Sequence, residues 1–263
     1  MILVVFFFFL FFITVTILPI FKRFFKTPRA FKTWAFHVCR PFVRLALFFL
    51  GIVKINVHGR IHPDSRTIVA NHLSLVETVL LLHQFPVSYL AASYLSTNTF
   101  IKRTAEIFDF VFVDRSKRQN ISTHLVNIAN DPSLLPVVVF PEGKVTNGEA
   151  LVGFRSGAYI SETLVQPVAI RYRLWLTPRS MSTISWNEDF LPLYIYQHFS
   201  IPFMTVDLDC LEPINWKGSN KSPKERAAES ELQIANHLGT LACCRTNKEL
   251  FTKKDDPLRN KAE

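Results

Sequence analysis

The chain of 263 residues is long enough for one sizeable domain, and 49% of its residues are apolar. Its net charge of +9 arises in residues 1–63, which hold nine Lys or Arg and no acid; 21 basic and 21 acidic residues follow. A nucleic-acid-binding domain carries its basic surface on the folded part, so this distribution argues against a nucleic-acid partner. The four cysteines lack metal-ligand spacing, which indicates reduced thiols and no metal site.

The first segment, residues 1–21, is uncharged and rich in phenylalanine. As a helix it would extend about 30 Å, the thickness of the hydrocarbon core of a bilayer. A cleaved signal peptide would need a basic start and a small-residue cleavage site, and neither is present. We therefore expect an N-terminal hydrophobic membrane anchor.

A basic segment follows, and it places this side of the membrane in the cytosol. Its polar residues recur at steps of three and four, as in a helix that lies in the membrane interface with its cations toward lipid headgroups: Lys26, Arg29, Thr33, His37, Arg40 and Arg44. Pro41 is expected to break or bend this helix, after which residues 45–53 can dip back into the bilayer. A hairpin in one leaflet and an ordinary amphipathic helix of a soluble domain both remain alternatives.

From about residue 55, short apolar strands alternate with helical segments. The predicted strands are 67–71, 88–92, 110–114, 135–140, 165–171, 183–186 and 204–211. The predicted helices are 75–84, 98–107, 117–130, 190–199 and 223–238. This alternation predicts an α/β fold with a mostly parallel central sheet flanked by helices. We divide the chain into an anchor with its interfacial helix or hairpin (1–54), a catalytic domain (55–240) and a charged tail (241–263).

The motif NHLSLVE (71–77) places His72 and Glu77 five positions apart behind an apolar strand. On a continuous helix these side chains would point about 140° apart. They can meet if His72 lies in the strand-to-helix turn and Glu77 in the first turn of the helix, with Ser74 as its cap. The carboxylate would then hold one imidazole nitrogen and leave the other as a base. Helix capping alone, without catalysis, is the alternative.

A second motif, FPEGKVTNG (140–148), follows the buried run PVVV and should emerge at the carboxyl end of a strand, where α/β sheets bind ligands. Glu142 can accept hydrogen bonds from a polyol, and Gly143 permits close approach of a ligand. Arg115 in VFVDRS and Arg155 in FRSGAY are candidates for binding a phosphate, although an arginine in such a motif alone is more often a surface ion-pair partner.

Together the blocks NHLSLVE, VFVDRS, FPEGKVTNG, FRSGAY and VQPVAIRY resemble the glycerolipid acyltransferase family, the PlsC-like lysophospholipid acyltransferases. The resemblance covers residues 55–215 and is nearest to the lysophosphatidylcholine and glycerol-3-phosphate acyltransferase branch, with its relative, ancient ubiquitous protein. It implies an acyl group moved from acyl-CoA, as co-substrate without another cofactor, to a lysophospholipid (lysophosphatidic acid or lysophosphatidylcholine) or to glycerol 3-phosphate. Endoplasmic reticulum or lipid droplet membranes, with the catalytic domain facing the cytosol, are the implied location.

The resemblance also assigns roles to residues. His72 would be the general base and Glu77 its orienting carboxylate. Arg115 and Arg155 would hold the acceptor phosphate, Glu142 and Gly143 would shape the glycerol pocket, and Pro167 would shape the acyl-binding wall.

Three departures from the family pattern bear on activity. Glu77 stands where aspartate is usual, and Lys144 stands where a small hydroxyl residue is usual, with Thr146 keeping a hydroxyl nearby. We count Lys144 and Thr146 among the substrate-binding residues, and Lys144 could either bind the phosphate or obstruct the pocket. The glycine expected before VFVDR is absent. A membrane or lipid-droplet adaptor with little catalysis, like ancient ubiquitous protein, is therefore the alternative function. A serine hydrolase is excluded because no G-x-S-x-G motif occurs.

Overall fold

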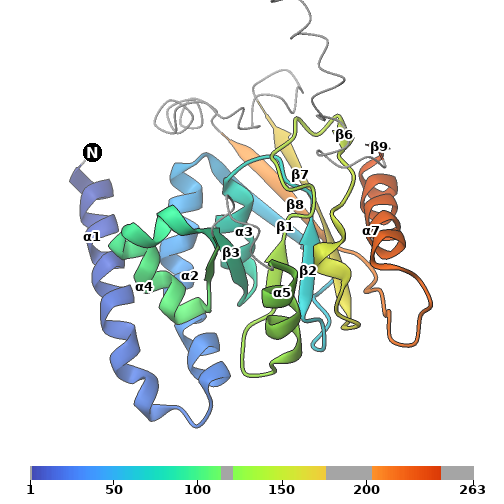
Figure 1. Ribbon diagram of the computed structural model, residues 1–263. Coiled ribbons are helices and arrows are strands. Elements are labelled where there is room, and N and C mark those ends of the chain that lie inside the picture. Colours follow the sequence, from blue (N-terminus) through green and yellow to red (C-terminus); the bar gives the residue numbers. More distant parts are fainter. Residues whose placement is uncertain (1, 114–120, 176–202, 244–263) are drawn as a thin grey trace, which may run out of the picture.

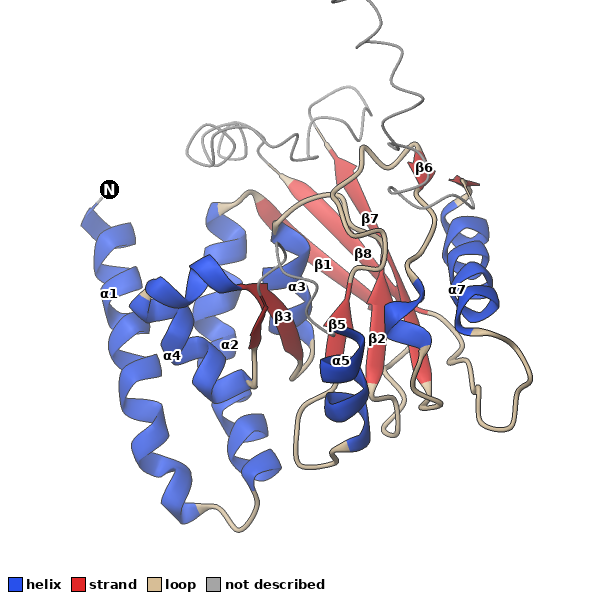
Figure 2. Ribbon diagram, in the orientation of Figure 1, coloured by secondary structure: helices blue, strands red, loops and turns tan. Residues whose placement is uncertain are grey.

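The computed structural model describes residues 2–113, 121–175 and 203–243 of the chain (Figure 1). The predicted strand 183–186 and helix 190–199, as well as the end of the tail, lie outside the described residues. In the described part, helices surround a central sheet (Figure 2).

The central sheet has seven strands in the described part, in the order β1-β8-β7-β2-β5-β3-β4. Neighbouring strands are parallel except for the antiparallel pair β7 and β8. Their bounds are β1 Ile52–His58, β2 Thr67–Ala70, β3 Ser88–Ala92, β4 Val111–Val113, β5 Val137–Val139, β7 Val165–Leu174 and β8 Met204–Cys210. The two short strands β6 (Ala150–Leu151) and β9 (Leu241–Ala242) pair separately. The prediction of an α/β fold with a mostly parallel sheet is confirmed.

The helices of the domain lie close to their predicted positions: α3 Val76–Gln84, α4 Thr99–Phe108, α5 Ile121–Asn130 and α7 Pro223–Leu238, with short 3-10 helices η2 (Ser93–Thr97) and η3 (Ser156–Tyr159). Helix α7 has the predicted bounds because both ends are capped. Ser222 and Glu225 form a capping box at its start, and Gly239 adopts a left-handed conformation at its end.

The N-terminal segment forms helix α1 (Ile2–Ile17), the 3-10 helix η1 (Leu18–Phe24) and helix α2 (Pro28–Phe49). None of the helices in the described ranges has both the length and the apolar character needed to cross a membrane. Large apolar side chains of α1 and η1 are nevertheless exposed: Phe9, Leu10, Phe12, Ile17, Ile20, Phe21 and Phe24. The membrane anchor therefore stays a prediction.

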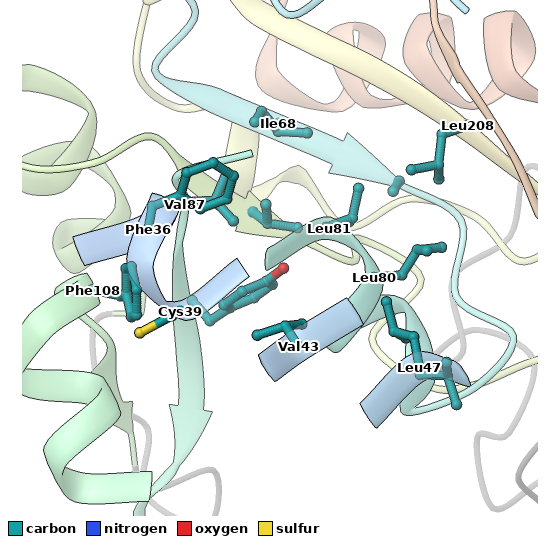
Figure 3. Close-up of a cluster of buried hydrophobic side chains, with 14 of the residues drawn as sticks. Phe36, Cys39, Val43, Leu47, Ile68, Leu80, Leu81, Val87, Phe108 and Leu208 are labelled. Atoms are coloured by element: carbon teal, nitrogen blue, oxygen red, sulfur yellow. The ribbon is translucent and has the colours of Figure 1, made fainter. Parts of the chain in front are cut away.

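Helix α2 packs against the domain along its whole length, which corrects the expected break at Pro41. That proline lies inside the continuous helix. Buried residues recur at every fourth position of α2: Phe31, Ala35, Cys39, Val43 and Leu47. Figure 3 shows Cys39, Val43 and Leu47 in one apolar cluster with Leu80 and Leu81 of α3. Residues 45–53 do not form an element of their own, since they complete α2 and begin β1.

Two basic residues of α2 form contacts with the rest of the domain. Lys32 is buried and its ammonium lies 2.6 Å from a carboxylate oxygen of Asp109, at the end of α4. The Arg44 guanidinium donates to the main-chain carbonyls of Ile52 and Val53 at 2.9 and 2.7 Å. These carbonyls lie at the start of the edge strand β1, so the guanidinium of Arg44 faces this strand.

Candidate active site

The site is built on the turn between β2 and α3. Asn71, just after β2, is buried and binds the backbone of β7 in both directions: its amide donates to the Ile170 carbonyl at 3.0 Å and accepts from the Ile170 N–H at 2.8 Å. A side chain thus replaces the next rung of the strand pairing. The backbone is free to turn, and His72 emerges at the carboxyl end of the parallel strand.

His72 and Glu77 meet across this turn. Helix α3 begins at Val76, so Glu77 lies in its first turn and reaches back toward the end of β2. Imidazole Nδ1 of His72 lies 3.0 Å from Glu77 Oε2, a hydrogen-bonding distance for the tautomer that carries its proton on Nδ1. The geometry that the motif requires is present.

The carboxylate of Glu77 is completely buried and accepts four further hydrogen bonds. Its Oε2 accepts the backbone N–H groups of Leu73 at 3.1 Å and Ser74 at 2.7 Å. Its Oε1 accepts the hydroxyls of Ser74 at 3.0 Å and Tyr172 at 2.7 Å. Helix α3 has Leu75 at its N-cap without a side-chain cap hydrogen bond, so the predicted cap by Ser74 is not formed as expected. Ser74 Oγ instead accepts the N–H of Val76, the first residue of the helix, at 3.0 Å, and Glu77 holds the two residues before Leu75.

A further contact, with Phe140, fixes the imidazole of His72. Its ring stacks on Phe140, with centroids 4.1 Å apart and planes 14° from parallel. The side chain is about 15% exposed, and Nε2 has no hydrogen-bond partner within the described ranges. The nitrogen not held by Glu77 is thus the one available to accept a proton.

The loop after β5 forms hydrogen bonds to both backbone groups of His72. Glu142 Oε1 accepts the His72 N–H at 2.8 Å, and the Thr146 N–H donates to the His72 carbonyl at 2.9 Å. Glu142 Oε2 accepts the Val152 N–H at 3.2 Å, which ties the end of the loop to the same carboxyl. The second motif therefore supports the first, through main-chain groups.

The position of Glu142 differs from the expectation that it faces a polyol. Its side chain is completely buried, because residues 140–152 fold over it. Burial raises its pKa to about 8, against the opposing effects of the hydrogen bonds from His72 and Val152. Glu142 thus braces the His72 turn from inside the fold.

Gly143 and Arg155 lie against each other beside this brace. Gly143 has a φ of +73°, and a Cβ at this position would lie 2.5 Å from Cζ of Arg155. The glycine is needed for its left-handed backbone and for the close approach of the guanidinium. Arg155 and Lys144 are exposed at this turn, whereas Arg115 lies outside the described residues. Pro167 is buried in β7, opposite Val69.

Tyr172 is the site residue that the sequence reading missed. It lies on β7 in the run VAIRYRL, and the signal was present: a tyrosine in register with the core-facing Val168 and Ile170 must bury its hydroxyl and find it a partner. No group of three His, Cys, Asp or Glu suited to hold a metal occurs among the described residues.

The fold and site together define an α/β domain with a histidine–carboxylate pair at the carboxyl edge of its sheet. Residues 54–171 of the chain match the acyltransferase family model.

Several known proteins similar to this chain are named acyltransferases. The chain is 27% identical over 174 residues to lysophospholipid acyltransferase LPEAT2 of Arabidopsis thaliana, a match that covers 64% of this chain and 30% of the relative. It is 26% identical over 205 residues to the lyso-ornithine lipid O-acyltransferase of Pseudomonas aeruginosa, which covers 74% and 76%. It is also 30% identical over 165 residues to human lysophospholipid acyltransferase LPCAT4, which covers 58% and 30%. The chain thus spans under a third of LPEAT2 and LPCAT4.

The fold is shared with a solved acyltransferase. The crystal structure of the 1-acyl-sn-glycerophosphate acyltransferase PlsC from Thermotoga maritima matches with a TM-score of 0.60 at 17% identity, over 88% of this chain and 94% of that one. At this sequence identity, the match shows a similar fold.

Proposed function

We propose that the protein transfers a fatty acyl group from acyl-CoA to the hydroxyl of a lysophospholipid or of glycerol 3-phosphate. The observation that carries the proposal is the His72–Glu77 contact of 3.0 Å, with the other imidazole nitrogen left to face a substrate. The match of residues 54–171 to the acyltransferase family and the similarity to lysophospholipid acyltransferases support the same reaction class.

In the proposed mechanism, Nε2 of His72 removes the proton from the acceptor hydroxyl as its oxygen attacks the thioester carbonyl carbon. Glu77 stabilises the imidazolium that forms. The carbon–sulfur bond breaks, and the imidazolium returns the proton to the departing thiolate. General-base assistance of this kind contributes about 10²–10⁴-fold to a rate.

The exposed cation Arg155 is proposed to bind the phosphate of the acceptor, together with Arg115. The exposed apolar residues of α1 and η1 are proposed to hold the protein on a membrane, where both acyl substrates reside. We place the protein at the endoplasmic reticulum or on lipid droplets, with the catalytic domain toward the cytosol.

The test is transfer from labelled acyl-CoA to lysophosphatidic acid, lysophosphatidylcholine and glycerol 3-phosphate, in membranes with matched amounts of wild type and His72→Ala. We expect one acceptor to be favoured and its acylation to be lost in the variant. Background activity of wild type with every acceptor would favour the adaptor alternative.

A further inference from the structure

The sheet has a polar hollow on the face opposite Glu77. Because side chains alternate along a strand, Met204, Val206 and Leu208 of β8 point into the core, whereas their neighbours point to the other face. There, a hollow of about 930 Å³ is lined by Lys54, Asn56, His58, Arg171, Tyr172, Arg173, Leu174, Trp175, Thr205 and Asp207. The function proposed above uses none of these residues except Tyr172, whose hydroxyl points to Glu77.

The hollow has an excess of positive charge. Three cationic side chains line it, from Lys54, Arg171 and Arg173, against the single carboxylate of Asp207. Asp207 is buried and accepts from Arg173 at 2.6 Å and from Asn56 at 2.7 Å. Arg173 remains 63% exposed, so the ion pair fixes the guanidinium in place and leaves donors facing solvent.

An exposed aromatic ring lies at one end of the hollow. Trp175 is 69% exposed, yet its indole N–H donates to the Thr205 hydroxyl at 2.9 Å. A ring that is held in place but uncovered offers a surface on which a base can stack, and the cations beside it suit a phosphate.

The hollow reaches the edge of the sheet on which the histidine lies. Ala70 of β2 pairs with Val168 of the parallel strand β7, so His72 is level with Ile170. Trp175 lies five residues further along β7, about 16 Å beyond that level. A ligand that is bound here and long enough to cross the edge can therefore present its far end to His72.

We propose that this hollow binds a phosphorylated adenine nucleotide, with the base on Trp175 and a phosphate between Lys54 and Arg173. This inference rests on the proposed function: the nucleotide that binds here is the nucleotide end of the acyl-CoA donor. A free nucleotide offers the same chemistry, and the experiment separates the two.

The first arm measures binding to the full-length protein in detergent, with adenosine 3′,5′-bisphosphate, ATP and inorganic phosphate as probes. We expect the bisphosphate to bind, and Trp175→Leu and Lys54→Glu each to weaken its binding by roughly tenfold. The matched controls are Tyr94→Leu, an equally exposed aromatic, and Lys217→Glu, an exposed lysine away from the hollow; both should bind as wild type. Absence of binding to wild type, or equal binding by wild type and both hollow variants, would overturn the proposal.

The second arm measures acyl transfer. If the site holds the donor, both hollow variants raise KM for acyl-CoA about tenfold, while kcat and KM for the acceptor stay near wild type. Loss of nucleotide binding without any change in KM for acyl-CoA would overturn the donor assignment and identify a free nucleotide as the ligand. If no acceptor is acylated but the bisphosphate binds through Trp175 and Lys54, the proposed function fails and the nucleotide site stands.

Discussion

Replacement of Glu77 by aspartate tests whether the longer side chain is a defect or a requirement. Aspartate is usual at this position in the family that the sequence resembles, so Glu77→Asp should raise turnover if the glutamate impairs the site. The structure predicts the opposite. The carboxylate of Glu77 is completely buried and accepts five hydrogen bonds from three directions: the imidazole, the turn before α3, and β7.

The magnitude follows from the geometry. Aspartate withdraws the carboxylate by about 1.5 Å, the length of one carbon–carbon bond. The contact to His72 would lengthen from 3.0 Å to well beyond hydrogen-bonding distance, or the Tyr172 hydroxyl would lose its acceptor. A misplacement of about 1 Å costs about 10²-fold in rate, and we expect a loss of that size in kcat.

The assay is acyl transfer at saturating substrate, with Glu149→Asp as the control because that exposed glutamate lies outside the pair. A Glu77→Gln variant separates position from charge. Its amide oxygen can keep the three donors at Oε2, while its NH₂ group donates to the two hydroxyls. It should therefore fold normally yet stabilise the imidazolium poorly. Turnover of Glu77→Asp equal to or above wild type would refute the reasoning.

Three further predictions concern the surroundings of the pair. Gly143→Ala should lower stability by about 1–2 kcal/mol through its positive φ, and should lower activity by displacing Arg155, as thermal unfolding and acyl transfer will report. Lys32→Met should lower the free energy of unfolding by about 3–5 kcal/mol, because Asp109 loses its partner in a largely buried ion pair. The pKa of Glu142 is raised from 4.5 to about 8, so its stabilising contribution is complete below pH 4.5 and is lost as pH rises through 8. In denaturation at several pH values, wild type should therefore lose up to about 1.4 kcal/mol per pH unit relative to Glu142→Gln within that window.

Each of these predictions has a matched control. Gly239→Ala carries the same positive-φ strain in open space and should leave activity unchanged. Lys221→Met breaks an exposed ion pair with Glu229 and should cost under about 1 kcal/mol. A pH profile for Glu142→Gln that parallels wild type between pH 5 and 8 would contradict the raised pKa of Glu142. An equal loss of activity in Gly143→Ala and Gly239→Ala, or an equal loss of stability in Lys32→Met and Lys221→Met, would contradict the other two predictions.

The elements with local signals were predictable from the sequence. Helix α7 carries its own start and stop residues, and the apolar strands β2 and β5 are unambiguous. Strand β1 was missed even though its polar residues Lys54, Asn56 and His58 alternate with apolar ones, because the preceding run of apolar residues suggested lipid contact.

Features that depend on packing were not predictable. Pro41 was expected to break or bend the helix, but α2 continues through it without a break because its buried face packs on α3. The inward turn of Glu142 depends on where Val152 folds back over it, and a motif cannot specify this. The contact between His72 and Glu77 was predictable because seven consecutive residues, 71–77, contain both the turn and the start of the helix.

Chemical rescue of a His72→Ala variant tests the central claim most directly. Truncation leaves space against Phe140 for an imidazole from solution, with Glu77 still in place to orient it. If His72 is the general base, acyl transfer falls to background in the variant and is partly restored by added imidazole. That restoration should be lost when Glu77 is also replaced by alanine. Wild-type turnover in His72→Ala without imidazole would contradict the mechanism.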